Sequence, residues 1–336
     1  MAASVAKTLA RIKGTVEEGA YYEAQQMYKT AFHRSKARNQ LADALQILQE
    51  GAITQLAHGQ VTCGVELGML LIEAYTTTAT PADEASVGRL QAIVLAFPPL
   101  PAVGSGPGAA TSAASTSAPS SASAGQGGSS SPVVDECARF VASAVKWANK
   151  GGAIVSARGI HSAFAAYLWR NFGTEGFGRA LLHFLRGDDA DTFASALRTC
   201  AQQGPAEEVD LWLLRAVLQV LNTANSHTRM GQLSHARALY DAFNAGLSSP
   251  LNTPTAHVTE LMLLAVEHVP LSPHAHKMLQ CAKQRYGDGV LRRDAQLAAQ
   301  LERVEGTYFG VRRRGAGNGP LGGLLGDLFK SLTEAH

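Results

Sequence analysis

Residues 21–75 read YYEAQQMYKTAFHRSKARNQLADALQILQEGAITQLAHGQVTCGVELGMLLIEAY. Three consecutive stretches of this segment, beginning at Tyr21, Leu41 and Val61, place apolar residues at spacings of three and four with polar residues between them, a pattern typical of amphipathic helices. Because the stretches begin roughly 20 residues apart, each helix with its turn is one unit of a repeat. The sequence therefore predicts an all-α fold, a right-handed helical-repeat solenoid built as a TPR-like array of α-hairpins.

The same periodicity recurs in the rest of the chain, and alternation of period two is hard to find. Asp135 is a plausible N-cap for a helix through Trp147, and Ser272 with Pro273 reads as an N-cap followed by proline at the first helical position. The stretch 209–221 is apolar nearly all round, which predicts a central, buried helix. Further helices are expected near 158–171, 175–187, 190–202, 207–224, 231–245, 255–268, 272–286 and 291–306.

One segment of low complexity interrupts this pattern. Residues 98–132 contain 6 Pro, 6 Gly, 10 Ser and 8 Ala in 35 positions, with no charged and no aromatic residue. Such a composition cannot build a packed core and predicts a flexible tether. The expected organisation is a helical-repeat half at 1–97, the tether at 98–132, a second helical-repeat half at 133–311, and a tail at 312–336.

The composition excludes several classes of protein. Apolar residues make up 46% of the chain and charged residues 17%, so it can bury a sizeable core. A net charge of +2 does not indicate a nucleic-acid-binding protein. No apolar run approaches the roughly 20 residues that span a bilayer, and Lys7, Arg11 and Lys13 disfavour a signal peptide. The four widely spaced cysteines suggest a reducing compartment, so we expect a cytosolic protein.

No catalytic or metal-binding motif stands out. The glycine-rich stretches 104–108 and 315–319 follow no strand and lack the lysine and Ser/Thr of a phosphate-binding loop. Histidines 268, 274 and 276, with Cys281, do not complete a metal-ligand set. We therefore expect no enzymatic activity and no cofactor.

Basic residues gather near the N-terminus. Lys7 and Arg11 lie one helical turn apart, and the run 29–38 carries basic residues without an acidic one. In a solenoid the two helices would be neighbours, which gives either a positive surface for an acidic partner or a merely solvated face. The candidate residues of the run are Lys29, Arg34, Lys36 and Arg38.

The C-terminal tail carries a leucine stripe at helical spacing. Such a short, glycine-weakened helix should form only by docking, either on a partner or back on its own chain, and a membrane-surface helix is less favoured. The stripe consists of Leu321, Leu324, Leu325, Leu328 and Leu332.

A series of short stretches runs through both folded segments. The stretches are EGAYYEAQQMY (18–28), GA (51–52), HGQ (58–60), LGMLLIE (67–73), VKW (145–147), His161, LW (168–169), HFL (183–185), EVD (208–210), AVLQ (216–219), LRRD (291–294), FGV (309–311) and GGLLG (322–326). No single stretch is decisive, but the ordered series resembles one family, the Golgi-to-ER traffic protein four family.

The resemblance implies a non-enzymatic α-solenoid that acts in the targeting of tail-anchored membrane proteins to the endoplasmic reticulum. In such an adaptor the N-terminal half docks on the targeting ATPase, and the C-terminal half holds a ubiquitin-like-domain protein that recruits the substrate-loaded co-chaperone. A BAG-domain scaffold is left open as a further partner. The resemblance places Lys7, Arg11 and Tyr21 on the ATPase-facing surface, and the four basic residues of the run join them by proximity.

Two departures from the family accompany the resemblance. The tether is much longer than the usual connection, which questions a rigid coupling of the two halves. Residues 247–254 (LSSPLNTP) lack the strand pattern of the β-hairpin that some members carry beside the ubiquitin-like partner. The alternative interpretation is a helical-repeat scaffold subunit of another cytosolic complex, proteasome-lid-like or vesicle-coat-like.

Overall fold

The computed structural model describes residues 2–100 and 131–311. Within these two ranges every regular element is a helix and no strand occurs, which confirms the predicted all-α class. Residues 247–253 contain bends and no strand, as expected from their sequence, and Pro254 begins the next helix. The tail leucines at 321, 324, 325, 328 and 332 and most of the predicted tether lie outside the described residues.

The chain forms two compact units, Met1–Thr192 and Phe193–His336. This division does not coincide with the expected halves at 1–97 and 133–311. Each unit is described by itself below.

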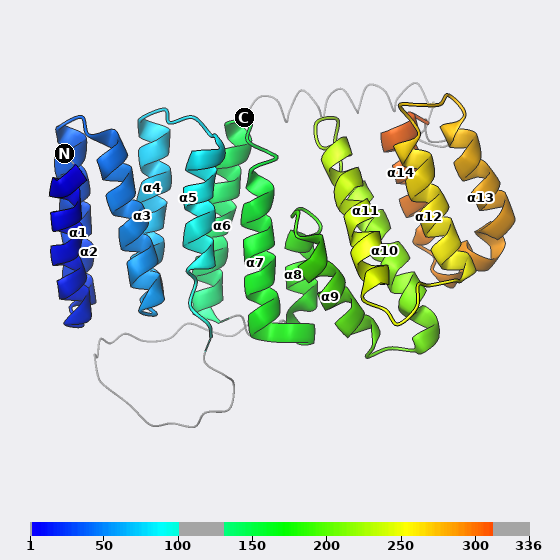
Figure 1. Ribbon diagram of the computed structural model, residues 1–336, viewed down its shortest axis with the longest axis horizontal. Coiled ribbons are helices and arrows are strands. Elements are labelled where there is room, and N and C mark those ends of the chain that lie inside the picture. The colour runs from blue at the N-terminus through cyan, green and yellow to red at the C-terminus, as the bar shows by residue number, and fades with distance from the viewer. Residues whose placement is uncertain (1, 101–130, 312–336) are drawn as a thin grey trace, which may run out of the picture. The chain divides into compact units, whose positions relative to one another are not determined.

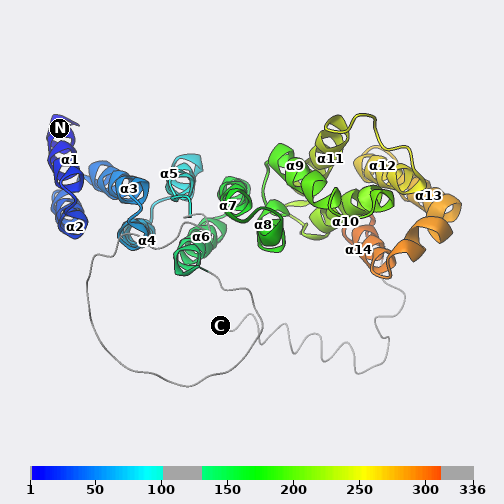
Figure 2. The ribbon, with the colours of Figure 1, turned by 90° about the horizontal axis from the view of Figure 1, so that it is seen from below.

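Unit 1 is a two-layered array of helices (Figures 1 and 2). One layer holds alternate helices, each packed on the next in that layer. In the second layer, made of the helices between them, α2 packs on α4 and α4 on α6, whereas α8 packs on α7 of the first layer. This is the solenoid that the repeat predicts. The first layer consists of α1 (Ala2–Glu17), α3 (Leu41–Ala57), α5 (Glu84–Leu95) and α7 (Ala157–Phe172), and the second of α2 (Tyr21–Ala37), α4 (Val61–Thr77), α6 (Pro132–Lys150) and α8 (Phe177–Phe184).

The turns of unit 1 repeat with a fixed period. After each of the first four helices, the second residue beyond the helix end has a positive φ. These residues are Gly19, Asn39, Gly59 and Ala79. At each turn the next N–H donates to the carbonyl five residues back, as from Gln60 to Gln55 at 2.9 Å. This is the Schellman ending, which satisfies orphan carbonyls at a helix C-terminus.

Ala79 is the strained member of this series. Its φ of 49° lies in the left-handed region, where a Cβ is unfavourable. We expect Ala79→Gly to raise the free energy of unfolding by about 0.5–1 kcal/mol, and Gly59→Ala to lower it by at least as much. Urea unfolding of both variants checks this, and a destabilising Ala79→Gly would contradict it.

The low-complexity segment interrupts one α-hairpin and does not separate two halves. Helices α5 and α6, which flank it, pack on each other, and α6 also packs on α4 and α7. Phe97, just before the segment, is buried, and its ring lies 6.1 Å from that of Phe140 in α6. On α7 it meets Phe164 at 6.2 Å and Tyr167 at 5.4 Å. Aromatic burial therefore joins the helices on either side of 98–132, and the division between the compact units falls after Thr192.

Phe97 can be tested against its exposed neighbour Leu95. Because Phe97 is 5% exposed among three aromatic rings, Phe97→Ala should cost about 3–5 kcal/mol of stability. Leu95 is 62% exposed, and Leu95→Ala should change the unfolding free energy by no more than about 0.5 kcal/mol. Denaturant titration compares the two, and equal effects would show that Phe97 does not anchor the hairpin.

Unit 2 is arranged around α10 (Val209–Asn222), which packs on three other helices of the unit. This confirms the buried central helix predicted at 209–221. The division falls in the first turn of α9 (Ala190–Ala201). The remaining helices are α11 (Arg229–Ala245), α12 (Pro254–Glu267), α13 (Ala275–Val290) and α14 (Leu297–Phe309), with a short 3-10 turn at Leu291–Arg293.

A buried ionic network fixes the 3-10 turn of unit 2. Arg293 Nη1 donates to Asp210 Oδ1 at 2.8 Å and to Thr255 Oγ1 at 2.6 Å. Thr253 Oγ1 donates to the other oxygen of Asp210 at 2.6 Å. Asp210 is only 5% exposed, so its charge is compensated by these donors.

Two expected helix starts are displaced. Helix α6 begins at Pro132 after Ser131, which puts Asp135 inside the first turn and not at the N-cap. Helix α13 begins at Ala275, and Ser272 Oγ accepts only from the N–H of His274, at 3.2 Å. At α6 the pair Ser131 and Pro132 supplies the N-cap and a proline in the first helical turn, which starts the helix earlier than expected.

Candidate functional site

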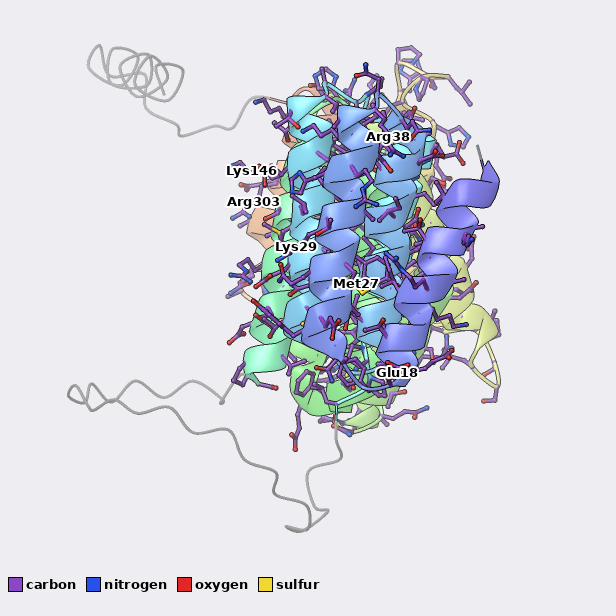
Figure 3. The ribbon with its side chains drawn as sticks, turned by 90° about the vertical axis from the view of Figure 1, so that its left-hand side faces the viewer. Glu18, Met27, Lys29, Arg38, Lys146 and Arg303 are labelled. Carbon is purple, nitrogen blue, oxygen red and sulfur yellow. The ribbon has the colours of Figure 1, made fainter. Side chains whose placement is uncertain are left out.

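A basic edge runs along α1 and α2 of unit 1. Lys7 and Arg11 are exposed on α1, about two turns and one turn before Thr15, whose hydroxyl contacts Met27 Sδ of α2 at 3.6 Å. Figure 3 shows Met27 where the two helices meet. The pair therefore lies on the flank of α1 that borders α2, and the predicted proximity of the two helices is confirmed.

The basic residues of α2 divide between its two flanks. Arg34 and Arg38 are exposed and take part in no salt bridge with the described residues. Lys29 and Lys36 lie on the α4 side, where Lys29 Nζ bonds to Glu66 Oε2 at 2.9 Å and Lys36 Nζ lies 3.4 Å from Thr77 Oγ1. Figure 3 shows Lys29 on the flank away from α1. The predicted residues therefore do not form one continuous patch.

The Lys29–Glu66 pair also includes a neutral partner. Gln25 Nε2 donates to the same Glu66 oxygen at 2.8 Å. The hydrogen bond from Lys29, followed by that from Gln25, holds the pKa of Glu66 below its usual value. Lys29 is thus a paired cation.

Tyr21 lies at the start of α2 and is half-buried. Its ring is 5.9 Å from that of His58, and its carbonyl accepts from Gln55 Nε2 at 2.8 Å. These contacts attach the first turn of α2 to α3.

A groove between α2, α4 and α6 was not predicted from the sequence. It encloses about 1090 Å³, and its lining includes Lys29, Met69, Lys146 and Trp147. The spacing of Arg139, Lys146 and Lys150 along α6 was visible in the sequence. The packing of α6 beside α4 was not predictable, because the low-complexity segment separates the two helices in sequence.

A half-buried histidine pair connects α7 and α8. His161 Nδ1 and His183 Nδ1 are 3.0 Å apart, so one ring donates and the other accepts. Burial lowers the pKa of both histidines to about 4, and the neighbouring Arg186 adds to the effect. Both rings are therefore neutral at pH 7.

This pair should make the protein sensitive to acid. Between pH 6.5 and about 4 the unfolded chain binds protons that the folded pair does not, so stability falls as the pH decreases through this window. The loss is at most roughly 3 kcal/mol for each histidine. His161→Asn keeps a polar group opposite His183. It should halve the decrease in unfolding free energy between pH 7 and pH 4.5, which urea titrations at the two pH values measure.

The matched control is His33→Asn, which removes an exposed histidine of α2. It should retain the pH dependence of the wild type. An undiminished acid sensitivity of His161→Asn would show that the pair does not carry it.

The histidines considered as metal ligands have other partners. His268 Nδ1 lies 2.7 Å from the Leu264 carbonyl, and His276 Nε2 lies 2.9 Å from Gln280 Nε2. Among residues 2–100 and 131–311 no group of three or more potential ligands could hold a metal ion. In the same ranges, no helix has both the length and the apolar character that crossing a bilayer requires.

These features define a class of protein: an all-helical repeat scaffold with a basic edge and a groove on its surface. A comparison with protein families matches residues 38–329 to GET4, described as Golgi to ER traffic protein 4. The chain belongs to this family, and its role lies in traffic to the endoplasmic reticulum. The match begins at Arg38, so Lys7, Arg11, Tyr21, Lys29, Arg34 and Lys36 precede it.

Individual relatives match nearly the whole chain. "Protein GET4" of Arabidopsis thaliana is 26% identical and aligns with 96% of this chain and 94% of its own. The human "Golgi to ER traffic protein 4 homolog" is 25% identical over 96% of this chain and 85% of its own. The structure titled "Crystal structure of C. therm. Get4" has a TM-score of 0.67 at 22% identity, covering 97% of this chain and 96% of that one. This last likeness supports the fold.

Proposed function

We propose that this protein is a non-enzymatic cytosolic scaffold in the post-translational targeting of tail-anchored membrane proteins to the endoplasmic reticulum. It bridges the targeting ATPase to a ubiquitin-like-domain protein and, through it, to the substrate-loaded co-chaperone. Membership of the family, matched over residues 38–329, carries the proposal. It also favours this function over a subunit of a proteasome-lid-like or vesicle-coat-like complex.

The basic edge of unit 1 is the proposed contact for the ATPase. Lys7 and Arg11 are exposed, and neither belongs to a salt bridge with another described residue. Their charges are therefore available to an acidic surface, which would speed encounter and set orientation. Arg34 and Arg38 extend this charge on α2, and Tyr21 supplies an aromatic surface at its first turn.

Unit 2 is the proposed holder of the ubiquitin-like-domain protein. The Asp210–Arg293 network makes the start of α10 a rigid support there. Holding two partners on one chain raises the effective concentration of the substrate at the ATPase without any chemical step. A BAG-domain scaffold is a further candidate partner of the same assembly.

Charge reversal tests the proposed ATPase contact. In the full-length protein, Lys7→Glu with Arg11→Glu should weaken binding of the targeting ATPase by about tenfold or more at low salt, and by less at high salt because ions screen exposed charges. Titration calorimetry at two salt concentrations measures both affinities, and circular dichroism checks that helical content is unchanged.

Lys13→Glu is the matched control, because Lys13 is also exposed on α1 but lies on another side of that helix. It should weaken binding much less than the double variant. Equal binding by the wild type and the double variant would refute the ATPase contact. Loss of the ubiquitin-like partner in the same double variant would instead indicate a folding defect.

A further inference from the structure

The groove of unit 1 is bounded by three helices. Residues of α2 and α4 form one side, and residues of α6 form the other. At one end α6 stops against the link between α4 and α5, because a Cβ on Gly151 would lie 2.4 Å from Ala82 Cβ. The end of α6 and this link therefore bound the groove at one end. Its volume of about 1090 Å³ is close to the upper limit of the roughly 300–1,000 Å³ typical of small-molecule pockets.

Apolar side chains are accessible inside the groove. Met69, Leu70 and Trp147 line it and are half-buried. The Trp147 ring is held in place by the buried Tyr75 ring, with centroids 4.7 Å apart. A rigid aromatic surface of this kind can receive an apolar side chain at a small cost in conformational entropy.

The α6 side of the groove is basic. Arg139, Lys146 and Lys150 follow one face of the helix at spacings of seven and four residues, which spans about 16 Å along its axis. Lys146 and Lys150 are exposed and take part in no salt bridge with the described residues. The bridge of Arg139 to Glu136 is long, at 3.7 Å, and Arg139 remains 60% exposed.

The opposite side of the groove offers little negative charge to neutralise the three basic side chains of α6, which we call the wall. The carboxylate of Glu66 is occupied by Lys29 at 2.9 Å and by Gln25 at 2.8 Å. Glu73 is the other carboxylate that lines the groove, against three basic side chains of α6. The groove is therefore apolar inside and positively charged along one side.

We propose that this groove binds an acidic amphipathic helix of a partner protein. The apolar face of that helix packs on Met69, Leu70 and Trp147, and its carboxylates lie along the wall formed by Arg139, Lys146 and Lys150. An open groove that follows helix axes suits the helix-in-groove mode of recognition. The acidic character follows from the wall, because an apolar partner would bury the two lysines without counter-charge. This site is separate from the proposed ATPase contact, on the other flank of α2.

Two designed peptides probe the groove of the full-length protein. Both are 16-residue helix formers with leucines at i, i+3, i+4 and i+7. One carries three glutamates beside the leucine face, spaced by seven and four residues as the basic residues of α6 are, and the other carries lysines at the same positions. Fluorescence anisotropy of the labelled peptides should show the acidic peptide binding at least about tenfold more tightly than the basic one, because the wall selects for charge.

Lys146→Glu with Lys150→Glu is the decisive variant, since both side chains are exposed and can be changed without disturbing the core. It should weaken the acidic peptide by about tenfold or more and favour the basic one. The Lys7→Glu, Arg11→Glu variant is the control and should bind the acidic peptide as the wild type does. This separates the groove from the proposed ATPase contact, which only the control variant disrupts.

Three results would overturn the proposal. Equal affinity for the two peptides would show that the wall does not select an acidic ligand. Unchanged binding by the Lys146→Glu, Lys150→Glu variant would place the peptide elsewhere. Tighter binding of a peptide with this chain's residues 319–336, at the same groove, would make it a site for its own leucine-rich tail.

Discussion

The burial of Phe97 against α6 and α7 is the interaction on which unit 1 depends. After this residue Leu100 N–H still donates to Asn171 Oδ1 of α7 at 2.7 Å, and the next helix, α6, begins only at Pro132, so no turn of ordinary length joins α5 to α6. The rings of Phe140, Phe164 and Tyr167 surround Phe97 at 5.4 to 6.2 Å. Loop closure becomes only slowly more costly as a loop lengthens. An aromatic cluster of this size can therefore hold an α-hairpin together around a long insertion.

Close packing of α6 on α4 then determines the groove. A Cβ on Gly68 of α4 would lie 2.7 Å from the Phe140 ring, so only a glycine permits the observed approach. This contact brings the wall of α6 alongside α4 and places Lys146 opposite the side that carries Lys29 (Figure 3). The same aromatic residue thus joins the core across the insertion and positions the groove's basic side.

Local sequence patterns predicted where the helices lie in the chain, but they did not predict all the pairs of helices that pack together. The 20-residue repeat from Tyr21 is visible because apolar spacing and left-handed turn residues are local signals. The pairing of α5 with α6 depends on contacts between Phe97 and Phe140, which no periodicity reveals. Lys29 and Lys36 were grouped with Arg34 by their closeness in sequence, but helical geometry places them on another flank of α2. Glu66, the partner of Lys29, belongs to a different helix.

The pairing of charges explains how two binding surfaces can coexist on unit 1. Lys29 and Glu66 satisfy each other between the basic edge of α1–α2 and the wall of α6. Exposed ion pairs contribute little to stability. The Lys29–Glu66 pair instead ensures that a partner covering it buries no uncompensated charge. Lys146 and Lys150 have no such partner among the described residues, so covering them with an apolar surface would be costly. The difference between a paired and an unpaired lysine therefore decides which part of the surface demands an acidic ligand.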